Sequence, residues 1–416
     1  GSTSFEGVEA LLPGHMLIVE RKGDRLEART QQYWDFVFPE QDRIPSVQEA
    51  EQDAQRYIDG VRERLIDAVA TRLEADVPVG CSLSGGIGSC SILGLATPMQ
   101  QSHVKAFTIA FDHTDYDESA IAREMAERTQ ADQEVLKLSA DDLYGDSFIT
   151  VVRHAERTFY NTLAVAKWHM SRRVRECGYK VVITGEGSDE LFGGYPFYKR
   201  DYFLHAAHEA GADDPTSAAG VFHGAILAEE QKTHPAWEEL CGFTPSWIQP
   251  WMITLEAAKP LFSGAVTEML REYDPIAEIA SRIDPAKVRN RHVMDVAQYT
   301  WSKTMLEGQI LTWGGDRVDM ANSMESRPAF LDHHLAEFAA TIPPCLRIRK
   351  GVEKWVLREA MKGVLPEVLY NREKFAFMAP PSGTDEDKHD AIGHLARHWL
   401  EPDRVAEVGL FDPEAV

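Results

Sequence analysis

Between residues 77 and 184, short apolar runs alternate with stretches in which apolar residues recur every three to four positions. The runs are typical of buried β-strands, and the recurring pattern is typical of helices that turn one face toward a core. Strand, helix and strand follow one another in this way, which predicts an α/β fold with a parallel sheet. The expected strands are 77–83, 104–111, 133–138 and 179–184, and the expected helices begin at about Ser89 and about Asp117 and run over about 162–177.

The segments on either side of this region carry different patterns. Two short strands joined by the turn Lys22-Gly23-Asp24 are predicted within residues 8–35, and an amphipathic helix is predicted over 47–76. Beyond residue 200 strand patterns fade and helical patterns dominate, so we expect a mostly helical C-terminal portion packed against the α/β core. The Pro, Gly and charged residues of 379–390 predict a loop.

The composition excludes several classes of protein. With 66 acidic and 43 basic residues among 416, the chain has a formal charge of −23, so neither a nucleic acid nor a membrane is expected as a partner. Its five cysteines are scattered and form no Cys-x-x-Cys pair, which indicates a reducing compartment and argues against zinc. The sequence has no apolar run of about 18 residues and no N-terminal signal-peptide pattern, so the expected location is cytoplasmic.

The stretch "SLSGGIGSC" (82–90) places glycines between a predicted strand and a predicted helix. A P-loop is excluded, because no Gly-Lys-Ser/Thr follows. Three interpretations are open. The stretch is an ordinary turn, or half of a dinucleotide fingerprint in which Gly86 and Gly88 precede a ribose-binding acid at Asp112, or a Ser-Gly-Gly loop that holds pyrophosphate when ATP is cleaved between its α and β phosphates.

A second glycine-rich loop, "VVITGEGSDELFGGYPFY" (181–198), carries Glu186, Asp189 and Glu190 after another predicted strand. If the strands take the order 3-2-1-4, with 77–83 as strand 1, the two loops emerge side by side at the carboxyl ends of neighbouring strands. Glycines for phosphates and carboxylates for a hard cation then share one site, which predicts Mg²⁺. The alternative is that these acids cap a helix and are solvated.

Further motifs follow the two loops in order, and together the motifs resemble the synthetase half of the glutamine-dependent asparagine synthetases, a family that includes the β-lactam synthetases. The resemblance extends from about residue 5 to about residue 380. It implies a parallel sheet of the ATP pyrophosphatase (adenine nucleotide α-hydrolase-like) type with a mostly helical C-terminal portion. The further motifs are "YDESAIAREMAE" (116–127), "GDRVDMANSMESRPAFLDHHL" (315–335), "GVEKWVLREAMKGVLP" (351–366) and "REKFAFMAPP" (372–381).

The resemblance also implies an ATP-dependent amide synthetase or amidotransferase. In this family ATP adenylates a carboxylic acid with release of pyrophosphate, and ammonia from glutamine or another amine then displaces AMP to form an amide. The resemblance implies that Asp189 binds Mg²⁺ and that Lys354 meets the phosphates. The nucleotide-binding residues it implies are Leu83, Ser84, Gly85, Gly86, Ser89, Gly185, Asp189 and Lys354.

The same resemblance assigns Glu186 as the base, with Glu325 as its partner. Burial and a like-charged neighbour are expected to raise the pKa of Glu186, so that it takes the proton of an attacking amine. Arg317 and Arg327 are candidate counter-charges, and the alternative for Glu325 and Arg327 is a structural ion pair. The expected catalytic residues are therefore Glu186, Glu325 and Lys354.

The Ser-Gly-Gly loop departs from the family at one position. Family members carry an aspartate there, the second protein ligand of Mg²⁺, and this chain has Gly88. Three explanations are open. A neighbour such as Glu186, Glu190 or Asp117 completes the coordination with water, the enzyme is impaired, or the change is engineered or accidental.

The acceptor region departs as well. The arginine with which asparagine synthetases hold the α-carboxylate of aspartate corresponds to Thr162, which cannot form a bidentate clamp, so aspartate is not expected as the substrate. Four nearby residues indicate a larger or less charged acid, unless they belong to the core. They are Phe159, Tyr160, Asn161 and Trp168.

Residues 5–35 resemble the end of the family's N-terminal glutaminase domain, whose nucleophilic cysteine is absent here. We therefore expect a remnant of that domain over 1–45 and an asparagine-synthetase-like ATP-binding domain over 46–416, with the glutaminase part missing from this chain. The predicted partners are a small carboxylic acid, an amine donor, the missing glutaminase segment and, in a homodimer, a second copy. The alternatives are a catalytically impaired homologue that acts as a binding partner and an NAD-dependent oxidoreductase.

Overall fold

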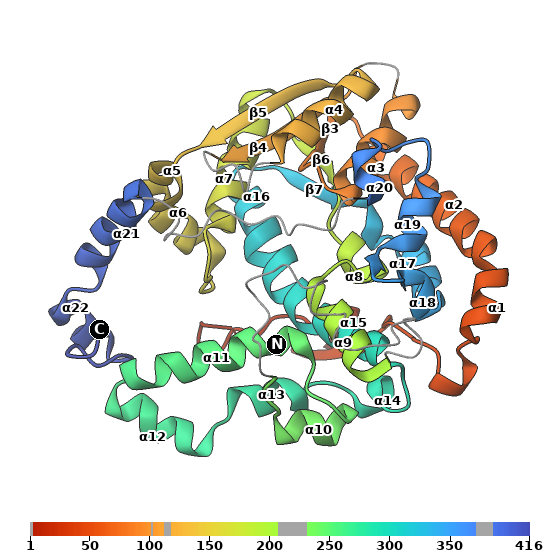
Figure 1. The fold of residues 1–416 in the computed structure, drawn as a ribbon. Coiled ribbons are helices and arrows are strands. Elements are labelled where there is room, and N and C mark those ends of the chain that lie inside the picture. Colours follow the sequence, from red (N-terminus) through yellow and green to blue (C-terminus); the bar gives the residue numbers. More distant parts are fainter. Residues whose placement is uncertain (1–2, 101–102, 112–117, 207–230, 372–385) are drawn as a thin grey trace.

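A parallel sheet of five strands organises the upper part of the molecule (Figure 1). The computed structural model describes residues 3–100, 103–111, 118–206, 231–371 and 386–416. The strand order β5-β4-β3-β6-β7 contains the order 3-2-1-4 considered from the sequence and confirms it. The strands are β3 (Val79–Ser82), β4 (Lys105–Phe111), β5 (Asp132–Leu138), β6 (Val181–Thr184) and β7 (Glu325–Pro328).

The two central strands are short and buried, as expected for strands covered on both faces. β3 and β6 pair in parallel, with Val79 opposite Val181 and Cys81 opposite Ile183. Both strands end at the same edge of the sheet. The loops that follow them therefore start side by side.

One helical layer covers the face toward which Cys81 and Ile183 point. Val61 and Leu65 of the long helix beside the sheet are fully buried and belong to the same apolar cluster as these two strand residues. The amphipathic pattern expected over 47–76 forms two helices rather than one. The Ser46–Glu49 capping box starts a short helix, and Asp53 separates it from the long one. The helices of this layer are α1 (Val47–Gln52), α2 (Ala54–Leu73), α3 (Ile87–Ala96), α4 (Ser119–Thr129), α17 (His333–Ala340), α18 (Pro344–Arg347), α19 (Trp355–Ala360) and α20 (Val368–Asn371).

A second layer covers the opposite face, where alternate strand residues point. Phe107 and Val182 pack there against Met170 and Val174 of the helix expected over about 162–177, which the structure confirms as α7. The helices of this layer are α5 (Ala140–Tyr144), α6 (Asp146–Ala155), α7 (Leu163–Glu176) and α16 (Arg317–Ala321).

The region beyond residue 200 is mostly helical, as predicted, and its helices between residues 235 and 301 lie below the sheet in Figure 1. Its core is aromatic and contains Tyr198, Tyr202, Trp237 and Trp247. A π-helical segment, η7 (Ser302–Asp316), leads from this region to α16. The other helices after β6 are α8 (Ser188–Phe192), α9 (Pro196–Ala206), α10 (Pro235–Cys241), α11 (Gln249–Ala258), α12 (Gly264–Glu272), α13 (Pro275–Ser281), α14 (Pro285–Val288), α15 (Val293–Trp301), α21 (Glu386–Trp399) and α22 (Pro402–Val408).

Two features of the second half differ from the sequence expectation. β7 was not predicted, because its residues "ESRP" contain no apolar run and end in proline; it pairs with β6 alone, at the edge of the sheet, where proline is tolerated. The loop predicted over 379–390 extends at most to residue 385, because α21 begins at Glu386. Residues 379–385 lie outside the described part of the chain.

The N-terminal segment forms the predicted two-stranded hairpin, β1 (His15–Lys22) and β2 (Arg25–Gln32). Trp34 and Phe36, which follow it, pack on the apolar cluster under α2, and Trp34 donates a hydrogen bond to Glu337 on α17. Two further antiparallel strands, β8 (Ile348–Arg349) and β9 (Val352–Glu353), precede α19. Among the described residues, no helix has both the length and the apolar character needed to cross a membrane.

We expect the packing of α2 on the sheet to dominate the stability of the fold. Leu65→Ala should lower the free energy of unfolding by about 2–5 kcal/mol, because it leaves a cavity at a fully buried position. Urea denaturation measures this loss. Glu63→Ala, on the exposed face of the same helix, is the control, and an equal loss in both variants would contradict the assigned orientation of α2.

Candidate active site

The Ser-Gly-Gly loop connects β3 to α3 and is closed by its own hydroxyl groups. Ser84 and Ser89 hydrogen-bond through their hydroxyls at 3.1 Å, and the backbone N–H of Ser84 donates to Ser89 Oγ at 3.1 Å. Gly85 has φ +81°, and a Cβ there would lie 2.7 Å from the carbonyl oxygen of Glu118, so this position requires glycine. Leu83 differs from the other predicted residues, since its side chain is buried in the core and its N–H bonds Phe107.

The second loop lies directly against the first. A Cβ on Gly88 would lie 2.5 Å from Ser188 Oγ and 2.9 Å from the carbonyl oxygen of Gly185. A Cβ on Gly185 would in turn lie 2.6 Å from the backbone nitrogen of Ser89. The two loops are therefore in contact at Gly88 and Gly185. Gly88, the departure from the family pattern, is the residue that this contact requires in the conformation described here.

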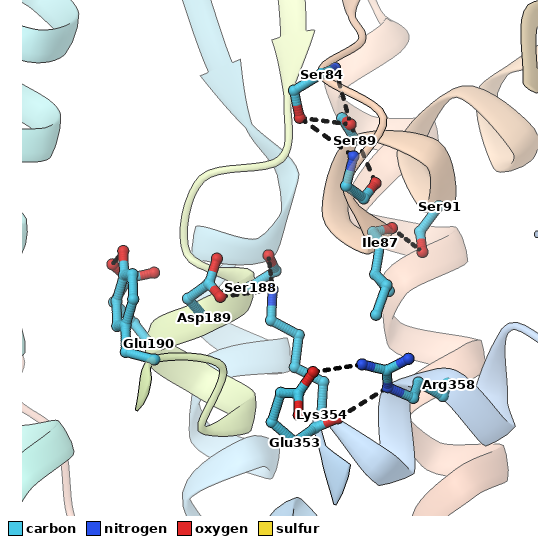
Figure 2. A network of polar contacts seen from close by, with 12 residues as sticks. Ser84, Ile87, Ser89, Ser91, Ser188, Asp189, Glu190, Glu353, Lys354 and Arg358 are labelled. Carbon is cyan, nitrogen blue, oxygen red and sulfur yellow. Dashed lines mark hydrogen bonds and ion pairs between the residues drawn. The ribbon is translucent and has the colours of Figure 1, made fainter. Parts of the chain in front are cut away.

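Lys354 lies below this junction and is buried, with 1% of its surface exposed (Figure 2). Its Nζ lies 2.8 Å from Asp189 Oδ1 and donates to Ser188 Oγ at 3.0 Å. The interpretation of Lys354 as a solvated helix residue is therefore excluded. Gly194 makes the approach possible, since a Cβ there would lie 2.1 Å from Asp189 Oδ1 and 2.2 Å from Lys354 Cε.

The backbone around Lys354 is held by a further set of buried charges. Lys354 takes the left-handed conformation, with φ +53°, at the residue before α19. Its neighbour Glu353 accepts hydrogen bonds from Arg358 at 2.5 Å and from Lys199 at 3.4 Å. Figure 2 shows the Arg358 side chain bonded to both the carboxylate and the carbonyl of Glu353. These contacts fix the direction in which the lysine side chain leaves the chain.

Glu190 follows Asp189 and is also buried. Its Oε1 accepts hydrogen bonds from the Tyr195 hydroxyl at 2.8 Å and from the Trp301 indole at 3.3 Å. Burial, together with the negative charge of Asp189, raises the pKa of Glu190. Because Glu190 is bound by the helical portion, it is a link between the second loop and α15 rather than a solvated helix cap.

Glu186 has a lysine rather than a second carboxylate as its immediate partner. Lys167 Nζ, on α7, lies 2.6 Å from Glu186 Oε1. Burial acts to raise the pKa of Glu186, but the charge and hydrogen bond of Lys167 outweigh it, so the pKa lies below its ordinary value. This is opposite to the direction expected from the sequence, and it means that Glu186 is ionised.

Glu325 does not lie beside Glu186. It pairs with Val181 at the start of β6, whereas Glu186 follows the end of that strand. Its carboxylate accepts a 2.7 Å hydrogen bond from Arg327, which also bonds the carbonyls of Arg72 and Glu74. Glu325 and Arg327 thus form the ion pair that was the alternative to a catalytic role. Arg317, the other candidate counter-charge, pairs with Glu156.

The acceptor-region residues divide between core and surface. Thr162 is buried, and Phe159 and Trp168 pack in the apolar cluster that contains Trp313. Asn161 Oδ1 accepts the N–H of Leu163 at 3.0 Å at the start of α7. Tyr160 is 58% exposed, and its ring lies 4.8 Å from that of Trp251 on α11. Of the four residues, Tyr160 is the one whose ring projects from the core.

The residues present do not form a ready magnesium site. Among the described residues, no group of three His, Cys, Asp or Glu side chains is placed to hold a metal ion. Asp189 is paired with Lys354, Glu186 is paired with Lys167, and position 88 has no side chain. Asp117, the remaining candidate ligand, lies outside the described residues, as does Asp112 of the fingerprint interpretation.

Sequence reasoning missed two members of the site, Lys167 and Asp319. Lys167 is the one charged residue in "LAVAKWHM", and a lone charge in an apolar helical stretch is a signal that could have marked it. Asp319 lies within a recognised motif, is 5% exposed and accepts a 2.7 Å hydrogen bond from Ser326 on β7. Its contact with β7 could not be foreseen, because β7 itself was not predicted.

The fold and the site together define a class of protein. Helices cover both faces of a parallel sheet, and two glycine-rich loops meet at the carboxyl ends of its central strands, where open α/β sheets bind ligands. The chain belongs to the asparagine synthase family, whose model, described as "Asparagine synthase", matches residues 60–416. The sheet is therefore of the ATP pyrophosphatase type, as the resemblance implied.

Three relatives illustrate the range of this family. The chain is 33% identical to "Amidase chyE" of Penicillium rubens and 31% identical to "Amidase chry2" of Gibberella zeae, in each case over 91% of this chain and 59% of the relative. It is 27% identical to "Asparagine synthetase [glutamine-hydrolyzing] 1" of Bacillus subtilis, over 83% of this chain and 51% of the relative. The chain thus spans between half and three fifths of the length of these relatives.

Because of the contact between the two loops, we expect substitutions of Gly88 and of Gly86 to change the free energy of unfolding by different amounts. Gly88→Ala should lower the free energy of unfolding by about 1–3 kcal/mol, because the new Cβ forces Ser188 and the Gly185 carbonyl to move. Gly86→Ala should cost less than about 1 kcal/mol, since its nearest contact would be 3.5 Å away and the change affects only the helix cap. Chemical denaturation of both variants tests this, and equal losses would contradict the close approach.

Proposed function

We propose that this chain is the ATP-dependent amide synthetase part of a longer protein. ATP would adenylate a carboxylic acid with release of pyrophosphate, and an amine would then displace AMP. The observation that carries the proposal is Lys354, a buried cation paired with Asp189 below the junction of the two glycine-rich loops. Burying a lysine is costly unless its charge is used or paired. The family match supports ATP and amide chemistry in general.

In the first step, the residues of the Ser84–Ser89 loop would hold the phosphates. The first N–H groups of α3 have no carbonyl of the helix to bind. They point out of its N-terminal end, which favours an anion. The acid's carboxylate oxygen attacks the α-phosphorus, and the bond from that phosphorus to the β-phosphate bridge breaks. Lys354 would stabilise the charge that accumulates on the departing pyrophosphate.

In the second step, the amine nitrogen attacks the acyl carbon, and the bond from that carbon to AMP breaks. The attacking nitrogen must lose a proton, and Glu186 is the candidate acceptor because it is ionised and lies in the second loop. Glu325 has no part in the proposal. Its place beside the base is taken by Lys167.

The acid is proposed to be larger or less charged than aspartate. Thr162 stands where the family resemblance places an arginine clamp, and it is buried. The exposed ring of Tyr160, packed edge-on against Trp251, offers an aromatic rather than a cationic surface at this end of α7.

The longer protein is proposed to carry a glutaminase domain before this chain. The hairpin β1–β2 and the segment up to residue 45 would be the end of that domain. Several large apolar side chains there are exposed, which is unusual for so short a segment and fits a surface covered by a neighbouring domain. They include Leu17, Val19, Leu26, Tyr33 and Val37.

A pyrophosphate assay tests the proposed function. The protein is mixed with ATP, Mg²⁺, hydroxylamine and a panel of carboxylic acids, and pyrophosphate and hydroxamate are measured. Formation of both with an aromatic or other bulky acid is the expected result. Absence of pyrophosphate with every acid would favour the impaired homologue, and amide hydrolysis without ATP would favour an amidase. The family match leaves nothing to support the NAD-dependent oxidoreductase.

Lys354 provides the sharpest variant for this assay. Lys354→Met should reduce the rate of pyrophosphate release by about 10²–10³-fold, because it removes the charge that offsets the leaving group. Lys354→Arg keeps the charge that pairs with Asp189 and should fold, but its displaced cation should still slow release. Lys362→Met, an exposed lysine just beyond α19, is the control. Undiminished release in folded Lys354→Met would contradict this role.

A further inference from the structure

Glu186 lies within a partly buried group of charges that the motif alone does not reveal. Lys167 reaches it from α7, and Asp319, on α16, lies close enough to feel the charges of both residues. The side chains of Lys167 and Glu186 are 22% and 23% exposed, so the ion pair is partly shielded from water. Three elements far apart in the sequence thus converge on one carboxylate.

The two oxygens of Glu186 are in different situations. Oε1 receives the 2.6 Å hydrogen bond from Lys167. Oε2 and the hydroxyl of Thr184, at the end of β6, are both buried and have no close hydrogen-bond partner among the described residues, although Thr184 lies near enough to Glu186 to help lower its pKa. Buried polar atoms are normally satisfied, so an unsatisfied oxygen of a held carboxylate indicates a group that binds there. One oxygen is therefore held by Lys167, and the other has no close donor among the described residues.

Asp319 makes the position of Lys167 important. Burial raises the pKa of Asp319 to about 7, and the negative charge of Glu186 acts in the same direction, while the charge of Lys167 acts against it. Asp316, at the end of η7, adds a further negative charge near Asp319. Without Lys167, the negative charges of Glu186 and Asp319 would lose the cation between them in the charge balance, and protonation would relieve their repulsion.

We propose that Lys167 is a positioning residue that holds one oxygen of Glu186, so that the carboxylate is placed to take the proton of the attacking amine. The inference rests on the proposed function and adds to it the group that makes Glu186 competent as a base. Simple stability does not explain the pair, because replacing a buried ion pair by apolar residues is often neutral or stabilising.

The pH dependence follows from the direction of the shifts. The depressed pKa of Glu186 gives a contribution to stability that is present above the ordinary carboxyl pKa and is lost as pH falls through the depressed value. Removing Lys167 eliminates that contribution and leaves unpaired carboxylates at Glu186 and Asp319. The penalty is largest when both are ionised, so Lys167→Met should be more destabilised at pH 8 than at pH 5.5.

A stability cycle tests the pairing without any turnover. Melting temperatures are measured at pH 5.5 and pH 8 for the wild type, Lys167→Met, Glu186→Gln and the double variant. The expected result is a larger loss at pH 8 in Lys167→Met, with most of that pH dependence removed when Glu186→Gln is added. An equal loss at both pH values, unaffected by Glu186→Gln, would overturn the inference even if the enzyme proves to be an amide synthetase.

A comparison of two nucleophiles tests the role of Lys167 in the reaction. Ammonium chloride supplies a nucleophile that must lose a proton to react, whereas hydroxylamine is largely unprotonated at neutral pH. In Lys167→Met the ammonia-dependent rate at pH 7 should fall at least about tenfold more than the hydroxylamine-dependent rate. Lys167→Arg, which keeps the charge, should recover part of this difference. An equal decrease of the rate with both nucleophiles would mean that Lys167 has only a structural role, and it would overturn the proposal.

Lys105→Met is the matched control. Lys105 is 16% exposed and pairs with Asp132 at 2.9 Å and Glu134 at 3.5 Å, at the start of β4 and away from the two loops. Its loss removes a comparable ion pair from the same sheet and should leave the ratio of the two rates unchanged. If the wild type releases no pyrophosphate with any acid, the proposed function fails, and the stability cycle still decides whether Lys167 holds Glu186 ionised.

Discussion

The close approach of two glycines, Gly88 and Gly185, is the constraint on which the site depends. It brings the loop after β3 against the loop after β6, and neither position has room for a β-carbon in the conformation described. The buried Lys354–Asp189 pair lies next to this contact and is itself admitted by a third glycine, Gly194. Absence of side chains, as much as their presence, therefore determines where the charged groups of this protein can lie.

The same constraint gives the unusual residue at position 88 a physical meaning. In the conformation described here, the Cβ of an aspartate at this position would meet Ser188 and the carbonyl of Gly185. In this chain the two loops are in contact, and the ammonium group of Lys354 neutralises the carboxylate of Asp189. Position 88 offers no second acid that could bind a cation together with Asp189. The charge balance of the site is thus carried by lysines, Lys354 on one side and Lys167 on the other.

Most of the sheet and part of the site could be predicted from the sequence. The four apolar strands were found because buried parallel strands leave continuous apolar runs, and Lys354 was found because it lies in a recognisable motif. β7 escaped because it is short, polar and held by one neighbour. The pairing of Glu186 with Lys167 escaped because it depends on where α7 crosses the sheet, which no local pattern records. Glu325, the expected partner of Glu186, pairs instead with the first residue of β6, and this too depends on how the strands pair rather than on a local pattern.

The late position of β7 in the chain has a consequence for biosynthesis. β6 ends at Thr184 and acquires its second neighbour only when Glu325–Pro328 arrives, about 140 residues later, and Lys354 follows later still. Pairings between such distant segments form slowly, because the intervening chain must first be closed into a loop. While the protein is being made, β6 therefore presents an open edge until Glu325–Pro328 has been synthesised.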